Sequence, residues 1–356
     1  MGALTITVRR AALENAGEAP AHRWAGLRLV LSVALVGAAF LGVLPRIASY
    51  EDAWERLADA RRAEIGLVVL AAAWNLASYW PLLMLALPGL TVRQAALSTQ
   101  VSTAVANTVP AGGAWGAGLT IAMYRRWGFS GTEVARALLV TGVWNIGTKL
   151  VLGLAAALAL LATAEGDASF VVGATSAALL LALVALVTLA VRRPGPARAV
   201  VEVAERAAGA VARLRRRTPQ HGWTLVADRL RRDIGALVAM RWRRLTLAAV
   251  VSHLSLFAVL LVAMHAAGLT GVSIMEALGV FSVVRVALVI PLTPGGAGIA
   301  EVGLSALIVT AGGGRPEAVA AVLLYRAVTW GLPVVLGALA WLLWVHERHA
   351  VEAKRS

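Results

Sequence analysis

Two apolar segments of this chain are each interrupted by proline and glycine, and the two interruptions lie 184 positions apart. The first reads Pro110-Ala111-Gly112-Gly113 and the second Pro294-Gly295-Gly296-Ala297-Gly298. Each is followed 23 residues later by a glutamate, Glu133 or Glu317, that opens a new apolar helix. Paired, broken hydrophobic segments at matching places in two halves indicate a transport site inside a membrane. The repeat therefore predicts two copies of one membrane unit.

The composition supports a membrane protein. Of the 356 residues, 59% are hydrophobic and only 15% are charged, which is more apolar surface than a soluble domain can bury. We expect an all-α polytopic fold with about six full spans and two re-entrant hairpins. The expected spans cover about 27–44, 65–87, 134–162, 169–191, 245–267 and 317–345.

A strongly basic segment covers residues 192–244, with fourteen arginines against four acidic residues. Basic loops face the cytoplasm in membrane proteins, and anionic lipid headgroups are their usual counter-surface. We therefore expect amphipathic helices of this insert to lie on the lipid surface. No nucleic-acid-binding motif accompanies the charge. This reading places both termini in the cytoplasm, with the protein in a plasma membrane.

The first broken segment, about 95–124, ends at Arg125 and Arg126. A single crossing would put this arginine pair outside, whereas a re-entrant hairpin keeps it inside, so the charges favour the hairpin. The second broken segment, about 275–311, then enters from the opposite side, which makes an inverted repeat. The expected regions are a tail at 1–24, a membrane domain at 25–345 with repeats at 65–162 and 245–345, and a tail at 346–356.

Four charged residues are expected inside the hydrocarbon region, namely Arg285, Glu301, Lys149 and Arg326. Each would cost at least about 2.5–3.5 kcal/mol at the bilayer centre if it were unpaired. Arg285 and Glu301 flank the second break on antiparallel limbs, so a pair across the hairpin is expected. It would handle a charged headgroup, act as a structural salt bridge, or do both. The excess of cations suits an anionic ligand such as a lipid phosphate.

The glycines at the breaks permit close backbone approach and start new helices with free N–H groups. Gly295, Gly296 and Gly298, after Pro294, are therefore expected to form a phosphate-facing nest, with Gly112 and Gly113 as the counterpart. The alternative is an ordinary helix kinked at proline. Two polar residues, Asn107 and Asn145, are expected to line the same cavity.

Several classes of protein are excluded or unsupported. The chain has no cysteine, so disulfides and thiol chemistry are excluded. It contains no nucleophile elbow, P-loop, dinucleotide fingerprint or metal-binding cluster. We therefore expect neither an enzyme nor a cofactor.

At the second break, the run Pro294-Gly295-Gly296-Ala297-Gly298-Ile299-Ala300-Glu301-Val302-Gly303 resembles a known family. It is similar to the membrane domain of lysylphosphatidylglycerol synthases, the flippase half of the multiple peptide resistance factor proteins. The resemblance covers about 25–345 and implies lipid translocation between leaflets, with intramembrane charges at Arg285 and Glu301. The synthases continue into an aminoacyl-transferase domain, which we expect to be absent here.

The resulting expectation is a flippase-like or scramblase-like lipid transporter. Its substrate would be an anionic or zwitterionic phospholipid, a polyprenyl-phosphate or a glycolipid. Two alternatives stay open: a secondary transporter of small solutes or ions, and a scaffold for a membrane glycosyltransferase or synthase. Homo-oligomerisation also stays open.

Overall fold

The computed structural model describes residues 37–109, 112–162, 223–289 and 293–353, with four isolated positions between 178 and 185. Every element in these ranges is helical and none is a strand, as the all-α expectation requires. In the first half they are η1 (Ala38–Val43), α3 (Leu44–Ile47), α4 (Tyr50–Ala58), α5 (Arg62–Ser78), α6 (Trp80–Ala86), α7 (Val92–Thr108), α8 (Gly112–Arg126) and α9 (Gly131–Ala162). In the second half they are α12 (Trp223–Ala266), α13 (Ile274–Ala287), η2 (Pro294–Gly296), α14 (Ile299–Thr310), α15 (Arg315–Arg326), η3 (Ala327–Gly331) and α16 (Leu332–Ala353).

Within the described ranges, four helical stretches are long and apolar enough to cross a bilayer: Arg62–Ala86, Gly131–Leu158, Asp228–Ala266 and Arg315–His346. They coincide with the spans expected at 65–87, 134–162, 245–267 and 317–345. Of the span expected at 27–44 only the end is described, in the short apolar stretch Ala38–Ile47. The span expected at 169–191 lies outside the described residues, apart from the four isolated positions.

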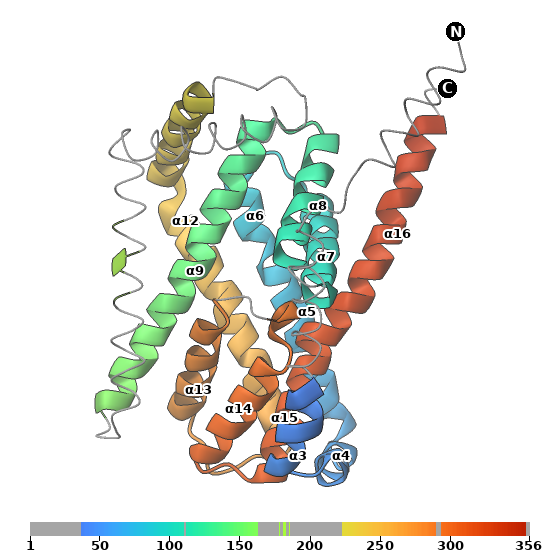
Figure 1. Ribbon diagram of the computed structural model, residues 1–356, viewed down its shortest axis with the longest axis vertical. Helices are drawn as coiled ribbons and strands as arrows, with labels where there is room; N and C mark the ends of the chain where they lie inside the picture. The colour runs from blue at the N-terminus through green and yellow to red at the C-terminus, as the bar shows by residue number, and fades with distance from the viewer. Residues whose placement is uncertain are drawn as a thin grey trace, which may run out of the picture.

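Each broken apolar segment folds into two helices that pack against each other, α7 with α8 and α13 with α14. The two pairs occupy opposite halves of the long axis, with α7 and α8 above and α13 and α14 below (Figure 1). The breaks fall where proline and glycine interrupt the sequence. An unbroken, proline-kinked helix is therefore wrong for both segments.

The helices of the two halves exchange partners. Helix α7, from the first broken segment, packs along α16 of the second half, and α13, from the second broken segment, packs along α9 of the first half. Helix α5 packs along α12. These three contacts interchange corresponding elements of the two halves, so the halves are interlocked rather than set side by side.

Matching caps start the two pairs. At α7, the Thr91 hydroxyl accepts a hydrogen bond from the Gln94 amide, and the Gln94 side chain accepts one from the Thr91 amide. Ser273 and Glu276 make the same reciprocal bonds at α13. Such capping boxes satisfy two N–H groups that the helix leaves free, so the chain marks both starting points locally.

One boundary differs from expectation. The segment 223–244 is not a separate helix, because α12 runs continuously from Trp223 to Ala266 (Figure 1). Its first half carries the basic residues and its second half is apolar. It contains no proline, and its one glycine, Gly235, does not interrupt it. Residues 192–222, the rest of the basic insert, lie outside the described residues.

The described residues form three buried apolar clusters, the smallest of which lies around Met123 and Trp344. The largest buried apolar cluster joins α12, α13, α14 and α15, with Phe281, Leu304 and Val319 among its members. A second cluster joins α6, α9 and α12 around Leu82 and Leu245. Helix α12 belongs to both clusters and therefore connects the upper and lower parts of the molecule.

Helix α4 crosses the lower end of the molecule (Figure 1). Its Arg56 guanidinium lies 3.1 Å from the Glu317 carboxylate at the start of α15. Trp54, on the same helix, is exposed. The position of α4 leaves this apolar ring available to a lipid interface.

Candidate functional site

The second break is a tight turn between α13 and α14. Gly295, Gly296 and Gly298 all have positive φ, and η2 forms a single turn between them. A side chain at Gly295 would collide with Asn107 of α7 and Trp330 of η3. Only glycine satisfies both the backbone angle and this close approach.

Glu301 and Arg326 hold this turn in place. One carboxylate oxygen of Glu301 accepts a hydrogen bond from the Gly298 amide at 2.7 Å, and the other accepts one from Arg326 Nε at 2.6 Å. Arg326 also donates to the Gly295 carbonyl oxygen at 3.2 Å. The Glu301 side chain is only 4% exposed. The pair thus links α14, α15 and the turn.

The ion pair expected between Arg285 and Glu301 is therefore wrong, since Glu301 pairs with Arg326 instead. The spacing along two antiparallel limbs predicted that Arg285 and Glu301 lie at similar depth. It could not show that a third helix, α15, would supply another cation to Glu301. Helix α15 brings Arg326 against the start of α14, where it donates to one Glu301 oxygen and to the Gly295 carbonyl oxygen of the turn.

The expected phosphate nest at the second break is also not available in this conformation. The amides of Gly296 and Ala297 donate to the Thr293 and Pro294 carbonyl oxygens. The Gly298 amide donates to Glu301, whose carboxylate sits at the positive end of α14. The site that an anion would take at this helix terminus is thus filled by the protein itself.

At the first break, glycine serves close helix packing. Pro110 and Ala111 lie outside the described residues. A side chain at Gly112 would collide with the backbone of Val105 and Ala106, and one at Gly116 would collide with the backbone of Ser102. The absence of side chains therefore lets α8 lie directly on α7.

The two breaks meet in the interior. Asn107, near the end of α7, is buried and donates from Nδ2 to the Trp330 carbonyl oxygen at 3.4 Å. Trp330 lies on the π-turn η3, and its ring also faces the Arg326 guanidinium at 5.8 Å. Helices α7 and α8 both contact η2 directly. Asn107 therefore connects the two breaks rather than facing an open space.

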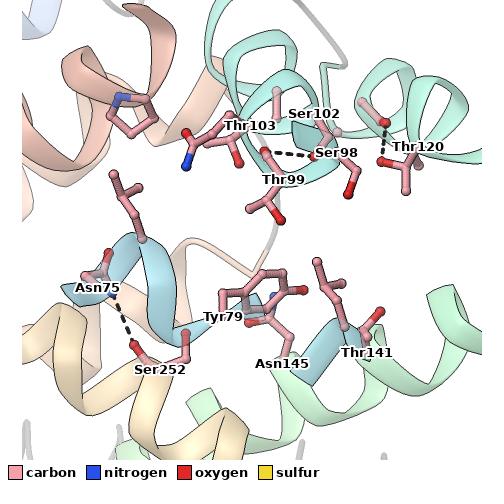
Figure 2. Close-up of a pocket in the computed structure, with 18 of the residues that line it drawn as sticks. Asn75, Tyr79, Ser98, Thr99, Ser102, Thr103, Thr120, Thr141, Asn145 and Ser252 are labelled. Carbon is pink, nitrogen blue, oxygen red and sulfur yellow. Dashed lines mark hydrogen bonds between the residues drawn. The ribbon is translucent and has the colours of Figure 1, made fainter. Parts of the chain in front are cut away.

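Beside this contact lies a cavity of about 430 Å³. It is lined by α5, α7, α8, α9 and α12, with single contributions from α6, α13, η3 and α16. In Figure 2 the side chains from α7 and α8 face those from α5, α9 and α12 across this space. Its polar lining residues are Asn75, Tyr79, Ser98, Thr99, Gln100, Ser102, Thr103, Thr120, Tyr124, Thr141, Asn145, Ser252, His253, Arg285 and Thr329.

Three lining residues carry buried polar atoms without a hydrogen-bond partner: Gln100 Oε1, His253 Nε2 and Arg285 Nε. His253 Nδ1 lies 3.0 Å from the Ala249 carbonyl oxygen, so Nδ1 carries the proton. An unpartnered buried polar atom is costly and uncommon in a folded protein. These three atoms belong to lining residues on α7, α12 and α13, so unpartnered polar groups are concentrated beside the cavity.

The cations of the site separate into two groups. Arg326 is neutralised by Glu301, whereas Arg285 and Lys149 form no ion pair within the described ranges and repel one another. Arg285 lines the cavity and lies 6.0 Å from the Phe281 ring, which supports it from one side. Lys149, on α9, is half-buried and is not among the lining residues. The local charge around the cavity is thus positive.

Of the residues expected to bind substrate, the cavity contains Arg285, Asn145 and Gly113. The others lie outside its lining. Most belong to the turn at the second break or to the first break, and the last is Lys149 on α9. Sequence reasoning missed the polar face of α7. Its signal was readable in the run Leu97-Ser98-Thr99-Gln100-Val101-Ser102-Thr103, where polar residues dominate an otherwise apolar segment.

Comparison with known proteins identifies a family. Residues 26–337 match the family described as the lysylphosphatidylglycerol synthase TM region. The matched segment includes both breaks and every residue that lines the cavity. No curated protein matches the chain.

Proposed function

The chain belongs to the lysylphosphatidylglycerol synthase TM region family, and from this premise we propose that it translocates lipids between the leaflets of a membrane. The range of substrates comprises anionic and zwitterionic phospholipids, polyprenyl-phosphates and glycolipids. The headgroup would enter the polar cavity while the acyl chains stay in the bilayer. The protein's own role is binding and passage, without a covalent step.

One observation carries this proposal: Arg285 is an unpaired cation in a polar cavity at the centre of an apolar protein. A charge in such surroundings is expensive, and chains that keep one use it for a ligand or an ion path. A structural role would require a partner, as Arg326 has in Glu301. Arg285 has none in the described part of the chain, so a phosphate group is the partner that fits.

The arrangement of the helices supports a transport mechanism. Helices α7 and α13 have 17 and 14 residues, which gives lengths of roughly 26 and 21 Å, less than a hydrocarbon core of about 30 Å. We infer that α7–α8 and α13–α14 are re-entrant hairpins that enter from opposite faces. The exchange of partners between the halves fits an inverted repeat, in which rocking of one half against the other alternates access.

The charge distribution supports an orientation. Arg125 and Arg126 lie at the end of α8, at the same upper end of the molecule as the basic first half of α12 (Figure 1). The acidic residues of α4 lie at the lower end. By the positive-inside rule, the upper end faces the cytoplasm of a bacterial plasma membrane. Anionic headgroups of that leaflet would contact the basic segment.

The test measures lipid movement directly. Purified protein is reconstituted into liposomes that contain trace lipids with a fluorescent acyl chain, and a membrane-impermeant reductant bleaches the outer leaflet. We expect labelled phospholipid to become fully accessible with wild-type protein. Arg285→Met should slow this by at least about tenfold, since losing a charged hydrogen bond costs about 1.5–3 kcal/mol.

Arg56→Met is the matched control, because Arg56 lies in an exposed ion pair at the far end of the molecule. It should leave the rate unchanged. A wild-type protein that moves no lipid of any headgroup would refute the proposal. Uptake of a water-soluble solute instead would favour a small-solute transporter. An Arg285→Met variant that loses stability without a change in rate would favour a scaffold.

A further inference from the structure

We infer that the cavity selects a phosphate ester that carries a polyol, and that it discriminates against headgroups with an ammonium group. This inference rests on the proposed function and specifies its substrate. It follows from the charge of the lining, from the hydrogen-bonding groups of the two walls, and from the position of Arg285.

The charge of the lining is positive and lacks an acidic counterpart. Arg285 is the one permanently charged side chain among the 24 described residues that line the cavity, and no carboxylate is among them. Glu301, the buried acid of the neighbouring turn, is committed to Arg326 and to the Gly298 amide. An ammonium group in the cavity would therefore meet Arg285 with no acid to neutralise it.

The family name refers to a lysylated lipid, whose lysyl group carries two ammonium groups. Such a headgroup needs carboxylates or aromatic faces around its cations. The described lining offers the cation Arg285 instead, with Lys149 close enough to add to its repulsion. The charge of this cavity thus fits the phosphate of a lipid and not a lysyl ester.

The rest of the lining suits hydroxyl groups. Fifteen of the 24 lining residues are polar, and most are hydroxyl or amide side chains. Thr99 and Thr141 donate their hydroxyl hydrogens to carbonyl oxygens of the preceding turn, at 2.6 and 2.8 Å. The Thr99 oxygen therefore remains as an acceptor toward the cavity, whereas the Thr141 side chain also has Tyr79 as a partner.

Donors are also present on both walls. The amides of Asn145 and Gln100 make no hydrogen bond within the described ranges, and each offers two N–H donors and one acceptor. Figure 2 shows Asn145 on one side of the cavity and Thr99 with Thr103 on the other. Adjacent hydroxyls of a polyol both donate and accept, so they match a lining that contains both acceptors and donors.

The size and position of the cavity agree with this ligand. A volume of about 430 Å³ lies within the range of small-molecule sites. Arg285 contributes from α13, whereas the hydroxyl and amide groups come from α5, α7, α8, α9 and α12. A phosphate held by Arg285 would therefore place its polyol among the polar groups of the first half.

The experiment compares headgroups in the liposome assay with one acyl label. Phosphatidylglycerol and phosphatidylinositol carry a phosphate and a polyol, phosphatidic acid carries the phosphate alone, and phosphatidylethanolamine and lysylphosphatidylglycerol carry ammonium groups. We expect the two polyol lipids to move roughly tenfold faster, or more, than the two ammonium lipids, because a site rejects groups it cannot pair. Phosphatidic acid should be intermediate.

Two variants test the walls with little change of shape. Thr99→Val and Asn145→Leu should lower the phosphatidylglycerol rate several-fold more than the phosphatidic acid rate, so that the preference for the polyol lipid is lost. Thr310→Val is the control, because the Thr310 hydroxyl makes the same bond within its helix but is exposed and outside the cavity. A general folding defect would instead lower both rates together, and would count against a role in selection.

The outcomes separate this inference from the proposed function. If ammonium lipids move as fast as phosphatidylglycerol, the selection is refuted and lipid transport stands. If no lipid moves but labelled glycerol 3-phosphate enters the liposomes, the cavity does select a polyol phosphate. The proposal that this ligand is a lipid headgroup is then refuted. If neither a lipid nor glycerol 3-phosphate moves, both proposals fail.

Discussion

At the scale of single residues, Glu301 shows how one carboxylate determines the shape of a turn. The buried Glu301 side chain accepts one hydrogen bond from the Gly298 amide and another from Arg326 on the next helix. Removing one member of a buried pair leaves the other charge without compensation, which costs more than removing both. The contrast with the unpaired Arg285 separates a structural cation from a candidate ligand-binding one.

We predict that Glu301→Ala lowers the free energy of unfolding by about 3–5 kcal/mol, because it leaves Arg326 buried and unpaired. The measurement is reversible unfolding in mixed micelles with increasing denaturing detergent. Glu276→Ala is a close control, since Glu276 also accepts from the amide three residues earlier, but this bond is exposed and no salt bridge of Glu276 occurs among the described residues. It should cost about 0.5–2 kcal/mol. Equal losses would show that the ion pair contributes nothing.

The double variant Glu301→Ala/Arg326→Met should recover part of the loss, because both charges leave the interior together. Arg285→Met should not reduce stability, since no partner is left behind and the repulsion from Lys149 disappears. A strong loss of stability in Arg285→Met would mean that Arg285 has a structural partner.

At the scale of helices, the two halves differ where the buried ion pair lies. With the offset of 184, Glu301 corresponds to Ala117 and Arg326 to Gly142. Ala117 lines the cavity, and a side chain at Gly142 would meet nothing within 4 Å. The first half therefore has open space where the second half has its ion pair.

We predict that Ala117→Met reduces transport strongly by filling part of the cavity, without destabilising the protein, because the added atoms enter existing space. The liposome assay and the detergent unfolding assay measure the two effects. Ala122→Met on the same helix is the control, since Ala122 is exposed and does not line the cavity. Equal transport in both variants would place the lipid path elsewhere.

The packing of α8 on α7 predicts opposite effects for two glycines of one helix. Gly116→Ala should destabilise the protein, because its new methyl group meets the Ser102 backbone, which cannot move aside easily. Gly118→Ala meets nothing and should stabilise α8 by about 0.5–1 kcal/mol. Detergent unfolding of both variants measures the difference. A similar shift in the same direction would argue against close packing of the pair.

At the scale of the whole molecule, the proposed orientation has a direct test, because the chain contains no cysteine. Arg126 ends α8 in the upper half, and Gly314 precedes α15 at the lower end (Figure 1). Arg126→Cys and Gly314→Cys should react with an impermeant thiol reagent from opposite sides of the membrane, the first from the cytoplasm. Labelling from one side would refute the inverted repeat.

Much of the architecture was predictable because it depends on local chemistry. Long apolar runs determine which helices can span a bilayer, and proline with glycine determines where two of them break. The caps at Thr91 and Ser273 are also local. By contrast, the predicted boundary between the basic segment and the span at 245–267 was wrong. A change from basic to apolar residues does not end a helix, and α12 continues through it. Helix continuity depends on backbone geometry, which tolerates that change.

The candidate site was less predictable, because it is assembled from helices far apart in the chain. The sequence by itself determined the all-helical membrane class, the two broken segments and the presence of buried charges. Only the tertiary structure decided that Glu301 pairs with Arg326, that Arg285 has no ion pair among the described residues, and that α7 lines the cavity. The physical reason is that spacing along one segment sets depth and face, whereas partners are chosen by how separate helices pack.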